Sequence, residues 1–239
     1  MNLKYKILAV LAVLAAGIAL TACGGSGAPA SAPASIVVPA SSHVAEEGVT
    51  EPINLRTWTL DDLDDTQTTT FVSASITSGV QNGKLTAKVF GYDIYKKEEI
   101  EKLAVGNKIA FHEEGAAQDQ CVTTEVKSIE RNDQHHFVSI NGGIEAGGVE
   151  LTLDHDVYRT VTFDDYPVYY EMGEVTLPLA GGVTLSDSSA DPQASAVETD
   201  GADAVAEAVN AEPDGWMPNN TLVFTEDGTI SSIVRIWVP

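Results

Sequence analysis

Residues 71–90, FVSASITSGVQNGKLTAKVF, decide how this chain folds, because two strand-like runs in it flank a turn signal. In the second run Leu85, Ala87 and Val89 alternate with polar residues, which is typical of a strand with one face in a core and one in water. Asn82-Gly83 lies between the runs, and Asn-Gly strongly favours a tight turn between two strands. The stretch therefore predicts an antiparallel hairpin.

Short apolar or β-branched runs continue along the chain at regular spacing, separated by Gly-rich turns. Such spacing is typical of all-β barrels and sandwiches. Residues 96–103 instead predict one short helix, and Asp227-Gly228 predicts a second hairpin. We therefore expect a mainly β fold, a small barrel or sandwich with one short helix. The further expected strands are 109–111, 121–129, 137–140, 149–153, 158–163, 174–177, 183–185, 222–225 and 230–238.

The chain is strongly acidic: 35 Asp and Glu residues stand against 13 Lys and Arg residues in 239, a net charge of −22. A surface of this sign repels nucleic acid and anionic lipid headgroups. The charge therefore argues against DNA or RNA as a partner.

Lys4 and Lys6 lie close to the N-terminus, and a 14-residue apolar run over residues 7–20 follows them. The run is shorter than the ~20 residues of a membrane-spanning helix and is typical of a secretory signal. The sequence Leu20-Thr21-Ala22-Cys23 at the end of this run resembles the lipobox of bacterial lipoproteins. The resemblance implies that residues 1–22 are removed as a signal peptide and that Cys23 carries lipid. The body of the chain is also similar to uncharacterised lipoproteins of gut-type Gram-positive bacteria.

Composition divides the remaining chain into two parts, the second of which contains an acidic insertion. Residues 23–52 are rich in Gly, Ala, Pro and Ser, so we expect a disordered, lipidated tether. Residues 53–239 are expected to form a single β-rich domain. Within it, residues 186–215 hold eight acids and no Lys or Arg, which predicts a mostly mobile acidic loop with a turn or two of helix at 202–209.

Tyr166, Tyr169 and Tyr170 form the densest aromatic patch and are the possible ligand surface. Tyrosine rings beside acidic residues suit stacking on a glycan or gripping a peptide. The alternative is that these rings simply pack into the β core.

The sequence contains no recognisable catalytic motif, so we expect no enzyme, no cofactor and no metal site. Asp62 follows Thr59 at the spacing of a helix cap, which explains the acidic run at 61–65 better than a calcium loop. Two alternatives stay open. One is an envelope hydrolase that uses paired carboxylates among Asp164, Asp165, Glu171 and Glu174. The other is metal capture by His135, His136 and His155.

Taken together, these features predict a membrane-anchored extracytoplasmic lipoprotein whose β-rich domain is non-catalytic. Its expected partners are the membrane, through the lipid at Cys23, and an envelope protein, a peptide or a glycan. Cys121 would then be the one cysteine left, which excludes an internal disulfide, and we expect it to be buried and inert.

Overall fold

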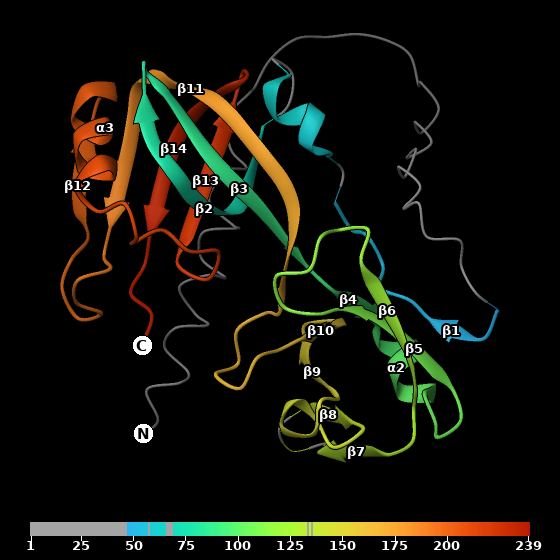
Figure 1. Ribbon diagram of the computed structural model, residues 1–239. Helices are drawn as coiled ribbons and strands as arrows, with labels where there is room; N and C mark the ends of the chain where they lie inside the picture. The colour runs from blue at the N-terminus through green and yellow to red at the C-terminus, as the bar shows by residue number, and fades with distance from the viewer. Residues whose placement is uncertain (1–46, 57, 66–68, 133, 135) are drawn as a thin grey trace, which may run out of the picture. The chain divides into compact units, whose positions relative to one another are not determined.

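The computed structural model describes residues 47–56, 58–65, 69–132, 134 and 136–239, and these belong to one compact unit (Figure 1). The fold is mainly β, as the sequence predicts. The expected signal peptide, Cys23 and most of the expected tether lie outside the described residues. None of the described helices is long and apolar enough to cross a membrane.

Five strands pair in a closed ring, which is the barrel form of the predicted fold (Figure 1). One long strand, β11, pairs along its first half with β3 and along its second half with β14. Strands β3, β2, β13 and β14 pair in that order and complete the ring. The strands are β2 (Thr70–Gln81), β3 (Lys84–Tyr92), β11 (Tyr169–Asp187), β13 (Thr221–Glu226) and β14 (Thr229–Arg235).

Both predicted hairpins of the barrel are confirmed. The turn between β2 and β3 has φ values of 52° at Asn82 and 73° at Gly83, and the turn between β13 and β14 has 52° at Asp227 and 67° at Gly228. Asn, Asp and Gly tolerate this left-handed backbone, which matches the twist of the two paired strands.

The barrel interior is filled by the apolar positions of the alternating strands, Leu85, Ala87 and Val89 among them. The short 3-10 helix η1 (Leu60–Asp64) adds Leu63, which is fully buried. The expected cap begins this helix: the Thr59 amide donates to Asp62 Oδ2 at 2.6 Å, and the Thr59 hydroxyl donates to the same atom at 2.9 Å. These two hydrogen bonds lower the pKa of Asp62.

Two strand predictions are corrected in their bounds. The runs at 174–177 and 183–185 belong to the single strand β11, which shifts register between Leu179 and Thr184 as it exchanges β3 for β14. Gly181 and Gly182 lie at this shift. The run at 121–129 is instead two strands, β6 (Cys121–Glu125) and β7 (Ile129–Asn132).

The acidic segment 186–215 is largely ordered, which corrects the predicted mobile loop. Strand β12 (Val197–Asp200) pairs with the end of β11. Helix α3 (Ala202–Ala211) lies beside these strands and buries Val205 and Val209 in the barrel core (Figure 1). The two valines are four residues apart and so share one helix face, an apolar signal that the acidic composition conceals. The short helix expected at 202–209 is confirmed and extended.

A second core lies under the other two sheets. One sheet has the order β4-β10-β9-β8-β7 and the other has β1-β5-β6. The predicted short helix is confirmed as α2 and packs Ile100 into this core. In addition to β6 and β7, this part of the protein contains β1 (Val49–Thr50), β4 (Ile94–Lys96), α2 (Lys97–Lys102), β5 (Lys108–His112), β8 (Phe137–Ile140), η2 (Ile144–Ala146), β9 (Val149–Asp154) and β10 (Val157–Thr160).

The tether prediction extends too far at its C-terminal end. Val49 and Thr50 form β1, which pairs in parallel with Lys108 and Ile109 of β5. A β-branched pair can join an existing sheet edge, because each added residue gains backbone hydrogen bonds there.

Candidate functional site

A cleft of about 870 Å³ opens beside the barrel and is the candidate binding site. Its walls come from residues 51–56 and 58–61, from the start of β2 and the end of β3, from the start of β11, and from the β5–β6 connection. A volume of this size lies within the range of small-molecule binding sites, roughly 300–1,000 Å³.

At the base of the cleft, Asp93 holds His112 through two hydrogen bonds. The His112 amide donates to Asp93 Oδ2 at 2.6 Å, and Nδ1 of the ring lies 2.8 Å from Asp93 Oδ1. The other ring nitrogen, Nε2, lies 3.0 Å from the carbonyl oxygen of Gln118. Both His112 and Asp93 are buried.

These partners favour a charged imidazolium at His112. A carbonyl oxygen only accepts hydrogen bonds, so Nε2 donates, and an ionised Asp93 makes Nδ1 a donor as well. Burial by itself lowers the pKa of His112, but the hydrogen bond and the charge of Asp93 outweigh it, so the pKa is raised. With both nitrogens donating, the ring has no lone pair with which to act as a general base.

Tyr170 connects His112 to a second cation. Its ring stacks on the His112 ring with centroids 4.1 Å apart, and its hydroxyl oxygen accepts a 2.7 Å hydrogen bond from Arg56 Nη2. The Arg56 guanidinium also lies 5.9 Å from the centroid of the Trp58 ring and 5.8 Å from that of Tyr170, within cation–π range. Two aromatic rings thus position one guanidinium in the cleft.

Gly91 makes room for this arrangement. It lies on β3 directly opposite Tyr170 in the β3–β11 ladder. A Cβ atom added there would lie 2.4 Å from Arg56 Nη1 and 2.8 Å from Tyr170 Cζ, so any side chain would displace them.

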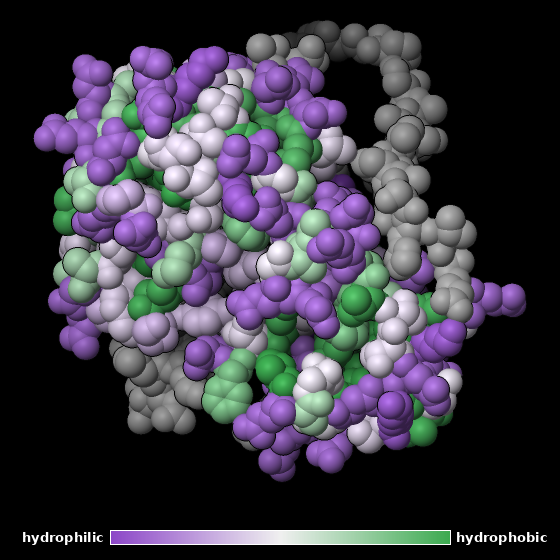
Figure 2. Space-filling model, viewed as in Figure 1, coloured by the Kyte–Doolittle hydropathy of each residue, from purple (hydrophilic) through white to green (hydrophobic). Residues whose placement is uncertain are grey.

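Apolar side chains border the same cleft and stay open to solvent. Leu55 is 62% exposed and Phe71 is 57% exposed. Such exposure is notable because Figure 2 shows hydrophilic side chains over most of the visible face, with only scattered apolar areas. The cleft therefore combines a cation with apolar surface.

Cys121 also lines the cleft, opposite His112 in the β5–β6 ladder. Burial raises the pKa of its thiol to about 11, and the charges of Asp93 and Glu51 act in the same direction. The thiol therefore stays protonated at neutral pH and is a poor nucleophile. The side chain is half-buried, whereas the sequence led us to expect a buried one.

The three predicted tyrosines do not form one surface. Tyr170 is buried at the cleft. Tyr169, its neighbour on the strand, packs edge-to-face on Phe90 and Tyr92, with ring centroids 6.5 and 6.0 Å away. Tyr166 lies in the turn before β11. Only Tyr170 therefore takes part in the candidate site.

The four carboxylates considered for hydrolysis are not among the residues that line the cleft. Glu171 pairs with Lys88 Nζ at 2.8 Å, and Glu174 Oε2 accepts a 3.3 Å hydrogen bond from the Thr77 hydroxyl. The remaining two, Asp164 and Asp165, are exposed in the turn before β11.

The histidines considered for metal capture include His135, which lies outside the described residues. His136 follows it in a turn at the start of β8. The exposed His155 has Nδ1 2.7 Å from Asp154 Oδ1. Within the part of the chain that the structure describes, no group of three or more His, Cys, Asp or Glu side chains is placed to hold a metal ion.

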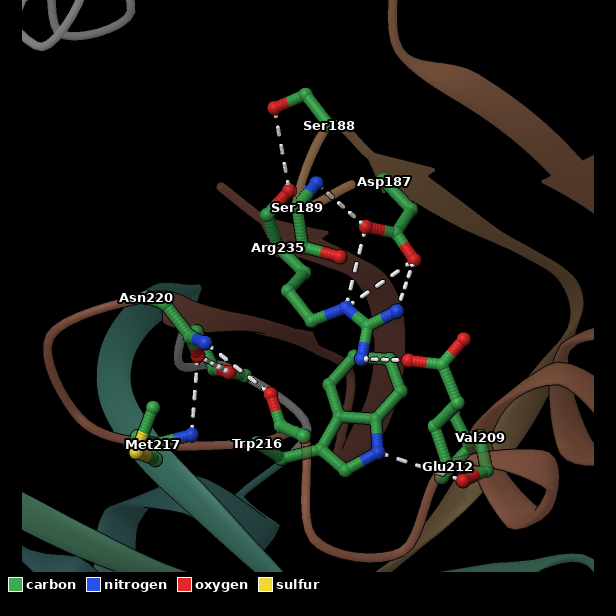
Figure 3. Close-up of polar contacts among 11 residues, drawn as sticks. Asp187, Ser188, Ser189, Val209, Glu212, Trp216, Met217, Asn220 and Arg235 are labelled. Carbon is green, nitrogen blue, oxygen red and sulfur yellow. Dashed lines mark hydrogen bonds and ion pairs between the residues drawn. The ribbon is translucent and has the colours of Figure 1, made fainter. Parts of the chain in front are cut away.

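A second polar cluster fastens the acidic segment to the barrel (Figure 3). Arg235 on β14 bonds the carboxylate of Asp187 through Nε and Nη2, and its Nη1 lies 2.8 Å from Glu212. Its guanidinium lies 4.2 Å from the centroid of the Trp216 ring, whose Nε1 donates to the Val209 carbonyl at 3.3 Å. This arginine has a structural role, because it joins Asp187, near the start of the acidic segment 186–215, to Glu212, near its end.

Sequence reasoning found Tyr170 but missed the rest of the cleft. Arg56 and Tyr170 are 114 positions apart, and Asp93 and His112 are 19 apart, so no local pattern joins them. An isolated Gly91 within an alternating strand was the one available signal, since such a glycine marks a close approach.

No protein-family model matches this chain, and no characterised protein or solved structure is significantly similar to it.

Proposed function

We propose that this protein is a lipid-anchored extracytoplasmic binding protein, whose non-catalytic β domain takes its ligand in the cleft beside the barrel. The observation that carries the proposal is the aromatic-held Arg56 in a cleft of ligand size. Strand β3, which pairs with β11 at Tyr170, and the hydrogen-bonded Asp93–His112 pair hold the site residues in place, which suits pre-organised binding.

The chemistry of the cleft supports binding rather than turnover. Both nitrogens of His112 are engaged, and the Cys121 thiol is held in its neutral form. The groups nearest Arg56 are thus placed to position a ligand instead of attacking one.

The anchor part of the proposal rests on the lipobox-like Leu20-Thr21-Ala22-Cys23. A diacylated cysteine would supply the two chains that stable membrane attachment needs. The acidic domain would then stand at a surface whose anionic lipids it does not bind.

Membrane fractionation and intact-mass measurement of the full-length protein and its Cys23→Ala variant test the anchor. We expect the native protein to carry acyl mass in the membrane fraction and the variant to lose both. A matched Cys121→Ala variant should stay membrane-bound. Equal partitioning of the native protein and the Cys23→Ala variant would contradict the anchor.

Native mass spectrometry of the detergent-solubilised protein tests the binding part. We expect a small molecule or short peptide to co-purify with the native chain and to be lost from the Gly91→Ala variant. An occupant retained equally by both chains would place the binding site elsewhere.

A further inference from the structure

Arg56 differs from the other three arginines of the chain in its partners. Arg159 has Asp154 and Asp165 within 4 Å, and Arg235 binds Asp187 and Glu212. Arg131 donates to the carbonyl oxygens of Ile100 and Leu103 at the end of α2.

The Arg56 guanidinium makes one hydrogen bond, to the hydroxyl of Tyr170, and no ion pair with any of the described residues. This is unexpected in a chain of net charge −22, where carboxylates are abundant. A guanidinium has five N–H donors, so the described residues satisfy only a small part of its hydrogen-bonding capacity.

Besides Arg56, the cleft is lined by His112 and by the acids Glu51, Asp61, Asp93 and Asp119. The His112 ring lies across the Tyr170 ring, and Asp93 is already engaged by two hydrogen bonds with His112. Among the described residues, Asp61 and Asp119, which also line the cleft, form no ion pair with Arg56. Arg56 is thus a positive group next to the rings of Trp58 and Tyr170, and it makes no ion pair with the described residues.

The apolar residues of the cleft determine which kind of group the ligand can carry next to its anionic group. Trp58 lies near the guanidinium, and Leu55 and Phe71, which are both more than half exposed, add apolar surface to the same cleft. Arginine binds a carboxylate through a planar fork of two parallel hydrogen bonds, and apolar surface favours an apolar body next to that group.

Resting on the proposed function, we propose that the cleft selects a carboxylate joined to an apolar or aromatic body, such as a small aryl-alkyl acid or the free C-terminus of a peptide ending in an apolar residue. Arg56 binds the carboxylate, and Trp58, Leu55 and Phe71 contact the body. Tyr170 is a positioning residue, because it holds the guanidinium by its hydroxyl and its ring.

Isothermal titration of the full-length protein in detergent, with two matched pairs of probes, tests this assignment. The first pair is 3-phenylpropionate and its neutral amide, and the second is N-acetyl-Gly-Phe with a free or an amidated C-terminus. We expect the acid of at least one pair to bind about tenfold more tightly than its amide, as a charge-assisted fork predicts. The pair with the tighter acid identifies the source of the carboxylate.

The Arg56→Gln variant should bind that acid no better than its amide, while the affinity for the amide stays the same. Arg56→Lys should recover only part of the preference, because an ammonium lacks the planar fork. Lys88→Gln is the matched control, since it removes a cation that lies outside the cleft and pairs with Glu171. It should behave like the native protein.

Equal affinity for acid and amide, or an acid preference that survives in Arg56→Gln, would overturn the inference while leaving the proposed binding function intact. Failure of the native protein to bind any of the four probes would also overturn the inference, while native mass spectrometry of the native chain and Gly91→Ala decides the proposed binding function separately.

Discussion

Arg235 and Arg56 each lie near a tryptophan ring, yet their remaining contacts differ. The Arg235 side chain is 4% exposed and binds two carboxylates, whereas Arg56 binds a tyrosine hydroxyl and no described carboxylate. A saturated guanidinium is part of the fold, and an unsaturated one in a cleft is available to a ligand. The comparison teaches that the partners of a cation, more than its aromatic neighbours, separate a structural role from a binding role.

The largest expected effect is on stability, at the structural arginine. Replacing Arg235 by Met leaves the carboxylate of Asp187 without its charged partner, which should lower the free energy of unfolding by about 3 kcal/mol. Urea unfolding of the full-length protein, followed by tryptophan fluorescence, measures the loss.

Glu212→Gln is the matched control, because the Glu212 side chain is 62% exposed. Its loss should stay below about 1 kcal/mol. Equal losses in the two variants would mean that Arg235 is no more than a surface ion-pair partner.

A smaller effect on stability, with a large effect on binding, is expected at Gly91. The Gly91→Ala side chain would displace Arg56 and Tyr170, which should cost roughly 1–3 kcal/mol as a local overpacking and abolish the acid preference of the cleft. Urea unfolding and probe titration on the same sample give both quantities. Gly181→Ala provides the control, because nothing lies within 4 Å of its added Cβ. A Gly91→Ala protein that keeps its acid preference would show that the guanidinium is not held as described.

Arg56→Gln should change the unfolding free energy by less than about 1 kcal/mol, since one partly buried hydrogen bond is lost and no buried charge is stranded. Urea unfolding beside Arg235→Met makes the comparison direct. A loss as large as that of Arg235→Met would assign Arg56 to the fold instead of to a ligand.

The smallest expected effect is a pH dependence from His112. Its raised pKa means that its stabilising contribution is fully present below about pH 6.5, the usual unfolded value, and is lost as the pH rises through the folded pKa. The groups that face this ring are Asp93, Arg56, Tyr170 and Cys121.

The unfolding free energy of the native protein should therefore fall across this pH window more steeply than that of His112→Gln. Urea titrations between pH 5.5 and about 8.5, a span chosen around the usual histidine pKa, measure both curves. Parallel curves would show that the Asp93–His112 bond does not favour the charged ring.

The sequence predicts the parts of the fold that depend on local signals. The turns at Asn82-Gly83 and Asp227-Gly228, the cap at Thr59 and the short helix α2 each follow from residues within a few positions of one another. The ordered acidic segment was missed because its stability comes from two valines and from Arg235, which lies far along the chain.

The cleft could be predicted only at Tyr170, for the same reason. Its central bonds join residues that lie far apart in sequence, and a net charge of −22 gives no hint that the arginine in the cleft lacks a carboxylate among the described residues. The pairing of a cation with its neighbours is set by tertiary structure, so it becomes visible only when the strands are in place.

A ¹H–¹⁵N correlation spectrum of the full-length protein labelled with ¹⁵N-arginine tests the central claim most directly, because the chain has only four arginine side chains to follow. On titration with the preferred acid, we predict that the Nε–Hε signal of Arg56, assigned by its loss in Arg56→Gln, shifts while the signal of Arg235 stays fixed. A shift at Arg235, or an unmoved Arg56 signal at saturating acid, would contradict the division of roles between the two arginines.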